Sequence, residues 1–166
     1  MSNENPYAPP EANVELAEAG QTVLAGRGAR LGGAVIDTII SFAIILPVMK
    51  FSGAWDRAMA QQQTLLELVG ISVLGFVLFL AVHGYLLANY GQTVGKHLAK
   101  TRIVSVQDER ILPFARLVGL RYLPVAFVSQ IPLLGPVLSL VDVLYIFRDD
   151  RRCVHDLIAG TKVIKA

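Results

Sequence analysis

A run of twenty residues without formal charge, 68–87, constrains the fold more than any other feature of the chain. It lies within an apolar block at 65–88, which has Glu67 at its start and His83 near its end. About twenty helical residues, each rising roughly 1.5 Å, cross the ~30 Å hydrocarbon core of a bilayer. The block therefore predicts a membrane-spanning helix. The composition agrees, because 54% of the residues are hydrophobic and only 17% are charged.

Three further apolar segments are predicted to span the membrane. The first, at 31–49, contains a single charge, Asp37. A later segment at 111–147 is longer than one span needs, and a turn rich in Pro and Gly divides it. We interpret this segment as a helical hairpin with spans at about 113–129 and 133–147. A single kinked helix or a re-entrant pair is the alternative.

Lysine and arginine are distributed unevenly among the loops. Of the 15 such residues, the loop at 50–64 holds only Lys50 and Arg57, whereas the loop at 89–110 and the C-terminal tail are richer. Positively charged loops favour the cytoplasmic side of a membrane. Both termini and the 89–110 loop are therefore predicted to be cytoplasmic, with the chain in the cell inner membrane. Four spans satisfy this arrangement and three do not.

These segments predict an all-α membrane protein, a small four-helix transmembrane bundle. Outside the bilayer, 101–106 and 161–166 are rich in β-branched residues and predict a short two-stranded pairing. Residues 27–166 form the predicted transmembrane domain. Residues 1–26 are polar, with too little apolar surface to offset their chain entropy, and are predicted to be a disordered cytoplasmic tail. They lack the basic start, apolar core and cleavage site of a secretory signal.

Four ionisable residues are predicted to lie at similar depths in the four helices. At about 1.5 Å per residue, Asp37 lies roughly 9 Å inside the cytoplasmic boundary, and His83 and Asp142 roughly 7–8 Å. Arg121 lies at roughly 10–14 Å by the same count. Such residues usually face the interior of a bundle and pair there. We therefore predict a polar intramembrane site made of these four side chains.

A purely structural role is an equal alternative for this layer. A bridge from Arg121 to either Asp37 or Asp142 would position the helices without conferring any activity. His83 alone is typical of a hydrogen-bonded interfacial histidine. Arg30 shares a helix face with Asp37 but lies about 10.5 Å from it along the axis. We interpret Arg30 as a cytoplasmic-side anchor in contact with water.

The remaining motifs indicate neither an enzyme nor a metal site. A single cysteine, Cys153, excludes an intramolecular disulfide and a cysteine-based metal site. Residues 91–96 resemble a phosphate-binding loop, but the motif is one residue short and ends in His97 instead of Ser or Thr. His155 and Asp156 are adjacent, which favours a helix cap or a tail anchor over a catalytic pair. We predict no catalytic residue, metal or cofactor, and the net charge of +2 does not indicate nucleic-acid binding.

Three motifs occur together in one order along the chain. Arg30 and Asp37 open the first apolar segment, Gly-Gln-Thr-Val-Gly-Lys at 91–96 follows the second, and His-Asp-Leu-Ile-Ala-Gly-Thr at 155–161 lies near the C-terminus. In this order and spacing they resemble the RDD family of bacterial membrane proteins, named for an arginine and two aspartates. The resemblance covers residues 27–166. The positions that carry it are Arg30, Asp37, Gly91, Gln92, Thr93, Gly95, Lys96, His155, Asp156, Gly160 and Thr161.

The resemblance implies that Arg30 and Asp37 are the arginine and the first aspartate of the family. Its second aspartate is either Asp156 or Asp142. The family is largely uncharacterised, and transport is the activity usually suggested for it. We therefore predict a transport-related, ion- or proton-coupled membrane protein. Because four short helices make a thin bundle, we expect a homo-oligomer or a membrane-protein partner. The alternative is a non-transporting scaffold or accessory subunit that docks a partner through its cytoplasmic loop and tail.

Overall fold

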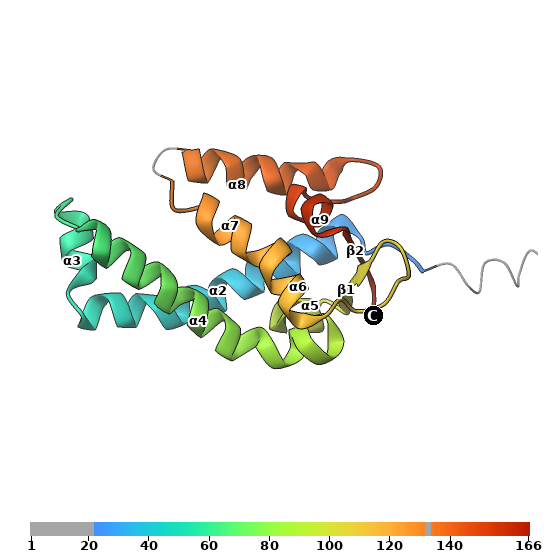
Figure 1. The fold of residues 1–166 in the computed structure, drawn as a ribbon, viewed down its shortest axis with the longest axis horizontal. Coiled ribbons are helices and arrows are strands. Elements are labelled where there is room, and N and C mark those ends of the chain that lie inside the picture. Colours follow the sequence, from blue (N-terminus) through green and yellow to red (C-terminus); the bar gives the residue numbers. More distant parts are fainter. Residues whose placement is uncertain (1–21, 132–133) are drawn as a thin grey trace, which may run out of the picture.

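The computed structural model describes residues 22–131 and 134–166. Most of the predicted N-terminal tail, residues 1–21, lies outside this described part. The chain is mostly helical, with one two-stranded sheet (Figure 1). Its two longest helices are α2 (Arg27–Phe51) and α4 (Leu65–Tyr90), joined by the short helix α3 (Ala54–Met59).

Helix α4 has a side-chain cap at its start and a glycine at its end. The Thr64 hydroxyl accepts a hydrogen bond from the Glu67 amide, and the Glu67 carboxylate accepts one from the Thr64 amide, both at 3.2 Å. Gly91 ends the helix in the left-handed conformation, with φ +63°. A Cβ atom on Gly91 would lie 2.6 Å from the Ile103 carbonyl oxygen. Glycine is therefore required here both for the turn and for the close approach of the chain that follows.

The predicted β pairing is confirmed. After the short helix α5 (Val94–Leu98), strand β1 (Thr101–Ser105) pairs antiparallel with β2 (Thr161–Lys165). Ser105 lies opposite Thr161 in this register. The segment before α2 also joins the sheet, because the Ala25 amide donates to the Val163 carbonyl at 3.0 Å. The sheet thus gathers the start, the middle and the end of the described chain at one end of the molecule.

The segment predicted to be a hairpin forms helices on both sides of its turn. The outgoing run comprises α6 (Phe114–Leu117), the π-helical turn η1 (Val118–Tyr122) and α7 (Leu123–Val128). The returning run comprises α8 (Leu134–Leu144) and the 3₁₀ turn η2 (Tyr145–Phe147), which lead to α9 (Val154–Ala159) and β2. Because α7 and α8 are separate helices that contact each other, the segment is not one continuous kinked helix.

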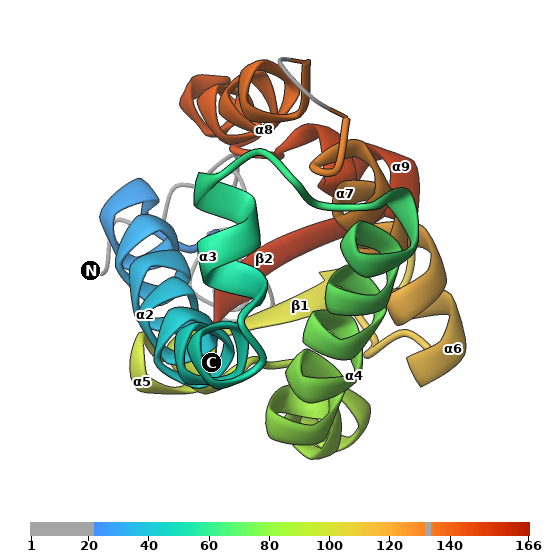
Figure 2. The same ribbon diagram turned by 90° about the vertical axis from the view of Figure 1, so that its left-hand side faces the viewer.

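The buried core lies at the sheet end of the molecule. It packs around Leu87 of α4 and includes Phe79 and Tyr122 at its edge. The other core residues are Ala25, Ile103, Leu112, Leu117 and Val163. Figure 2 looks along the long axis and shows α2, α4, α7 and α8 arranged around the molecule in front of this sheet end. The long apolar helices therefore extend well beyond the core.

The apolar side chains of the long helices are largely exposed. Ile39 of α2 is 62% exposed, and Leu66 and Val73 of α4 are 82% and 57% exposed. Both α2 and α4 are long and apolar enough to cross a membrane. In a soluble protein such faces would be buried, so their exposure indicates a membrane protein. The apolar run Leu134–Phe147 is shorter and, at 1.5 Å per residue, rises only about 21 Å.

Candidate functional site

Asp37 on α2 is bound by the motif that follows α4. Its Oδ2 accepts a hydrogen bond from the Thr93 hydroxyl at 2.5 Å, and its Oδ1 accepts one from the Gly95 amide at 2.7 Å. His83 lies next to it, with Nδ1 3.9 Å from the same Oδ1. Thr93 also caps α5 by accepting from the Lys96 amide. The Gly-Gln-Thr-Val-Gly-Lys motif is thus a helix start that binds the carboxylate of α2.

Two glycines allow α2 and α5 to pack backbone against backbone. A Cβ atom on Gly95 would collide with the Gly33 carbonyl oxygen and would lie 2.8 Å from the Asp37 carboxylate. A Cβ atom on Gly33 would lie 3.1 Å from the Gly95 carbonyl oxygen. Any larger residue at position 95 would therefore displace Asp37, which accounts for the glycine at that point of the motif.

Asp156 at the start of α9 binds two arginines from distant elements. Its Oδ2 lies 2.5 Å from Nη2 of Arg30, and its Oδ1 accepts from Nη1 of Arg121. Nη1 of Arg121 also donates to the Thr161 hydroxyl at 2.6 Å. The Asp156 carboxylate caps its own helix as well, by accepting from the Cys153 amide at 3.1 Å. We call this cluster of Arg30, Arg121 and Asp156 the arginine clamp.

The arginine clamp is buried and its charges stabilise one another. Asp156 is 0% exposed, Arg121 3% and Arg30 8%. Burial opposes ionisation of Asp156, but the positive charges of Arg121 and Arg30 outweigh it and hold the pKa of this carboxyl well below its usual range. Arg121 projects from the π-helical turn η1, and such turns occur frequently at functional sites.

A second pair, Asp142 and His155, links α8 to α9. Nδ1 of His155 lies 2.6 Å from Asp142 Oδ2, and the His155 amide donates to Asp142 Oδ1 at 2.9 Å. Burial and the nearby Arg121 charge lower the pKa of His155, although Asp142 opposes this shift. His155 is therefore neutral at pH 7. It also connects the two clusters, because its Nε2 lies 3.9 Å from Asp156 Oδ1.

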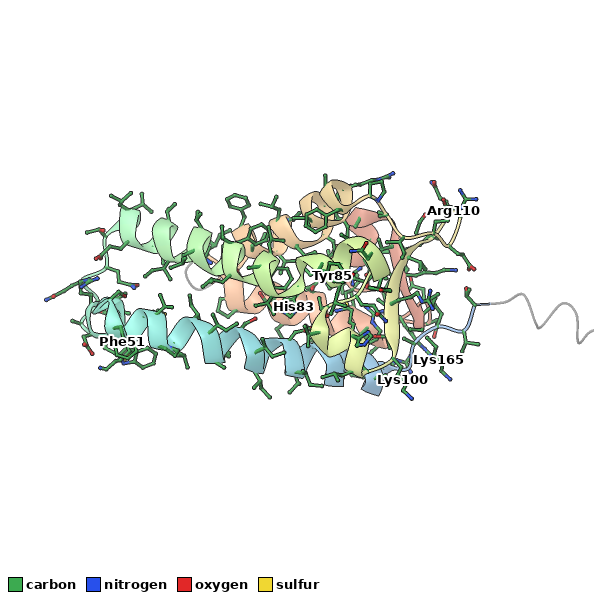
Figure 3. The ribbon with its side chains drawn as sticks, turned by 90° about the horizontal axis from the view of Figure 1, so that it is seen from below. Phe51, His83, Tyr85, Lys100, Arg110 and Lys165 are labelled. Carbon is green, nitrogen blue, oxygen red and sulfur yellow. The ribbon has the colours of Figure 1, made fainter. Side chains whose placement is uncertain are left out.

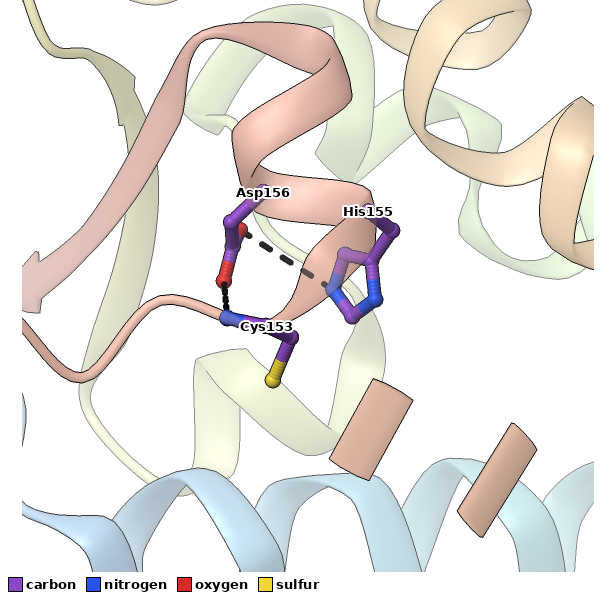
Figure 4. Close-up of side chains that lie close together, drawn as sticks. All are labelled: Cys153, His155 and Asp156. Atoms are coloured by element: carbon purple, nitrogen blue, oxygen red, sulfur yellow. Dashed lines mark hydrogen bonds and ion pairs between the residues drawn. The ribbon is translucent and has the colours of Figure 1, made fainter. Parts of the chain in front are cut away.

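Cys153, His155 and Asp156 lie close enough together to be considered as metal ligands (Figure 4). Their chemistry does not suit a metal ion. Both Asp156 oxygens are bound by guanidinium groups, and His155 Nδ1 is bound to Asp142. Burial raises the pKa of the Cys153 thiol to about 11, which disfavours the thiolate that binds metals. The three residues instead form part of the ion-pair network.

A cavity of about 1070 Å³ lies between the helices above these clusters. Apolar residues of α2, α4, α7 and α8 form most of its wall. Ionisable residues from five different elements form its floor at the sheet end. They are His83, Lys96, Arg121, Asp142 and His155, with Tyr122 beside them. We call this space the bundle cavity.

Three of the four residues predicted to share a polar layer line the bundle cavity, namely His83, Arg121 and Asp142. Asp37 lies beside His83, where Thr93 and Gly95 bind it. The considered bridge from Arg121 to Asp37 or Asp142 is not formed, because Arg121 binds Asp156 instead. The two carboxylates of the layer, Asp37 and Asp142, are thus bound by residues other than Arg121, which the sequence offers as the partner of either one.

The interpretation of Arg30 as a water-exposed anchor is wrong. Its side chain turns inward and binds Asp156, which lies 126 positions later in the chain. Its Nη1 also donates to the Arg151 carbonyl. Of the two candidates for the second aspartate of the motif, Asp156 is the one that binds the arginine. No local spacing in the sequence could reveal a contact between residues so far apart.

Sequence reasoning also missed three polar residues at the cavity floor. In the sequence, Lys96 is marked only as part of a motif, His155 is interpreted as part of a helix cap or tail anchor, and no pattern indicates Tyr122. Their position in the sequence is an available signal. Lys96 and His155 lie within two of the motifs, and Tyr122 directly follows Arg121. The tertiary fold is what turns them toward the same space.

Comparison with known proteins identifies a family and a relative of this chain. The model of the RDD family matches residues 24–160, which is most of the chain. The chain is also similar to an uncharacterized protein of Haemophilus influenzae, with 28% identity over 95 residues that cover 56% of this chain. The aligned part covers 57% of that relative, or little more than half of its length. No solved structure matches. Because the family model matches most of its length, this chain belongs to the RDD family.

Proposed function

We propose that this chain is a multi-pass inner-membrane protein in which four helical runs cross the bilayer and the bundle cavity binds a solute during proton-coupled transport. The observation that carries the proposal is the cavity itself. It lies between apolar helices, and its floor holds titratable side chains from five elements. Ionisable groups at membrane depth are typical of substrate pathways and proton relays.

The distribution of charge supports the orientation with both termini in the cytoplasm. Lys100, Arg110 and Lys165 lie at the sheet end of the molecule, opposite Phe51 at the far end (Figure 3). The positive-inside rule assigns such an end to the cytoplasm. Exposed apolar residues of the hairpin, such as Phe127 (70% exposed) and Leu140 (59%), extend the apolar surface of α2 and α4 around the bundle.

Cysteine labelling tests the number of spans. In a Cys153→Ser background, Gln62→Cys and Gln130→Cys mark the two proposed external turns, and Gln107→Cys marks the cytoplasmic loop. A membrane-impermeant maleimide applied to spheroplasts should label the first two and label Gln107→Cys only after permeabilisation. Labelling of Gln130→Cys only after permeabilisation would exclude a spanning hairpin and leave a two-span protein.

The Asp142–His155 pair is the best candidate for proton coupling. His155 is neutral at pH 7, so a proton that reaches it converts a hydrogen bond to Asp142 into an ion pair. The same proton adds positive charge 3.9 Å from the Asp156 oxygen that Arg121 binds. Protonation of His155 therefore changes the balance of charge around Asp156. Asp156 is the shared carboxylate of the arginine clamp, which joins α2, η1 and α9.

Proteoliposomes that contain a pH-sensitive dye test this proposal. An imposed gradient of the transported solute, screened first among Na⁺, K⁺ and Li⁺ and then among organic anions, should drive proton movement in wild-type vesicles. Asp142→Asn and Asp37→Asn should each abolish it, whereas Asp149→Asn, at an exposed position, should not. The proposal is wrong if wild-type protein drives no proton movement, or if Asp142→Asn transports normally while folded.

The scaffold alternative has less support in the geometry. Asp156 is fully buried and Lys96 lines the cavity, so these residues of the motifs are directed into the chain. A docking surface for a partner would have to use other residues of the loop and tail. Copurification of one defined partner in the absence of any flux would favour that alternative.

A further inference from the structure

Two polar groups at the floor of the bundle cavity have no hydrogen-bond partner within the described part of the chain. The Tyr122 hydroxyl is buried and unpaired, and the Lys96 ammonium makes none of the side-chain hydrogen bonds or ion pairs found there. Both residues line the cavity. A buried polar group without a partner is costly, so the Tyr122 hydroxyl indicates that something else binds it. Lys96 is only partly buried and adds a positive charge to the same floor.

The floor of the cavity is cationic. Arg121 makes its side-chain bonds to Asp156 and Thr161 through Nη1, and it is among the residues that line the cavity. Burial and the Arg121 charge lower the pKa of Lys96 to about 8, which still leaves it mostly protonated at neutral pH. Asp37 and Asp156 do not line the cavity, and Asp142 is bound to His155. An anionic group therefore complements this floor.

The walls of the cavity are apolar and long. On α2 the lining extends from Thr38 to Met49, which is about 16 Å at 1.5 Å per residue. This length is about half of the ~30 Å hydrocarbon core, or one leaflet of a bilayer. The apolar lining residues include Ile44, Ile45, Ile71, Phe76, Phe79 and Val125. A hydrocarbon chain therefore complements the walls.

We propose that the bundle cavity binds an anionic amphiphile drawn from the bilayer, with a carboxylate or phosphate headgroup on Lys96, Arg121 and Tyr122 and a hydrocarbon tail between α2 and α4. The proposal deepens the proposed function by assigning a ligand class to the same cavity, and it rests on that function only in treating the cavity as a ligand site. A headgroup of this kind satisfies both unpaired donors, and charge-assisted hydrogen bonds are the strong ones.

Binding is tested with the purified full-length protein in non-ionic detergent. The probe is a fluorescent long-chain fatty acid, and its methyl ester is the uncharged control. We expect saturable binding of the acid and at least tenfold weaker binding of the ester. Phosphatidylglycerol should displace the acid, whereas phosphatidylcholine should not. Equal binding of acid and ester, or equal displacement by inorganic phosphate, would overturn the proposal.

Two variants separate the headgroup from the tail. Lys96→Gln should weaken binding of the acid about tenfold, Lys96→Arg should restore most of it, and Lys100→Gln, at an exposed position, should have no effect. Gly75→Leu fills the wall, because a Cβ atom there already lies 3.8 Å from Ile45 Cδ1. It should abolish binding while the melting temperature stays near that of the wild type. Wild-type affinity in both Lys96→Gln and Gly75→Leu would contradict the proposal.

Flux measurements on the same preparations distinguish this inference from the proposed function. Saturable binding of the acid without any coupled proton movement would refute transport and leave the ligand site standing. Proton-coupled flux of an inorganic cation, with no binding of the acid, would refute the ligand class alone. Loss of acid binding together with loss of flux in Gly75→Leu would support both.

Discussion

Nη2 of Arg30 lies 2.5 Å from Oδ2 of Asp156 and joins the first turn of α2 to the start of α9. The two residues are 126 positions apart, and Arg121 binds the other oxygen of the same carboxylate. The three elements that carry these residues therefore meet at one buried charge. The arginine clamp explains why a cation stands at the start of an apolar helix, where it opposes the helix dipole.

Removal of the shared carboxylate should be severely destabilising. Asp156→Asn leaves two buried guanidinium groups without a counter-charge, and loss of one partner in such a cluster costs about 3–5 kcal/mol. The melting temperature in detergent should fall by roughly 10 °C. Asp149→Asn removes one carboxylate charge at an exposed position and should change stability by less than about 0.5 kcal/mol. Similar melting temperatures for the two variants would show that the clamp contributes little.

The contact between α2 and α5 should tolerate no side chain at position 95. Gly95→Ala places a Cβ atom against the Gly33 carbonyl oxygen and the Asp37 carboxylate, so it should destabilise the protein by about 1–3 kcal/mol. Gly32→Ala is the matched control, because a Cβ atom there meets nothing within 4 Å. It should be neutral or stabilising by up to about 1 kcal/mol, since alanine favours helix. Thermal unfolding of both variants measures the difference.

Lys96 should destabilise the ligand-free protein in a pH-dependent way. Its pKa is lowered to about 8 by burial and by Arg121, whereas that of an unfolded lysine is about 10.4. Between these values the unfolded chain binds more protons than the folded one, so stability falls as the pH falls through this window. The penalty is complete below about pH 8.

Lys96→Gln should therefore raise the stability of the ligand-free protein at pH 7 by about 1–2 kcal/mol, because the lysine is only partly buried and water screens part of the effect. The gain should shrink as the pH rises from 8 toward 10.4. Lys100→Gln, which is exposed, should show no such trend. Melting curves recorded between pH 7 and pH 10 compare the two variants, and parallel profiles would contradict the assigned pKa.

Cys153 should report on the integrity of the clamp. Its thiol is buried, and burial raises its pKa to about 11, so very little thiolate exists at pH 7. A maleimide should label it at least ~100-fold more slowly in the folded protein than after denaturation. Gln107→Cys in a Cys153→Ser background provides an exposed control that should react rapidly. Asp156→Asn should make Cys153 reactive, and continued protection would mean that the clamp does not hold α9 in place.

The elements of this fold follow from local sequence patterns. The charge-free run at 68–87 predicted α4, the β-branched segments predicted the sheet, and the break at Pro132 to Pro136 separated α7 from α8. Each of these signals operates over a few neighbouring residues, because helix propensity, strand propensity and turns depend on local backbone preferences. The positions of α2, α4, α8 and the two strands could therefore be predicted closely, whereas no pattern predicted the π-helical turn η1 that interrupts the outgoing run.

The ion pairs could not be predicted in this way. Counting residues along a helix predicts the depth of Asp37 or Arg121, but it does not predict rotation about the helix axis or which helix lies next to which. Several carboxylates at similar depth are equivalent partners for one arginine by charge alone. Packing removes this degeneracy, since Gly33 against Gly95 places Asp37 on α5 and the sheet carries Asp156 to the two arginines. The sequence thus specifies the helices, and their packing specifies the polar contacts on which the proposed function depends.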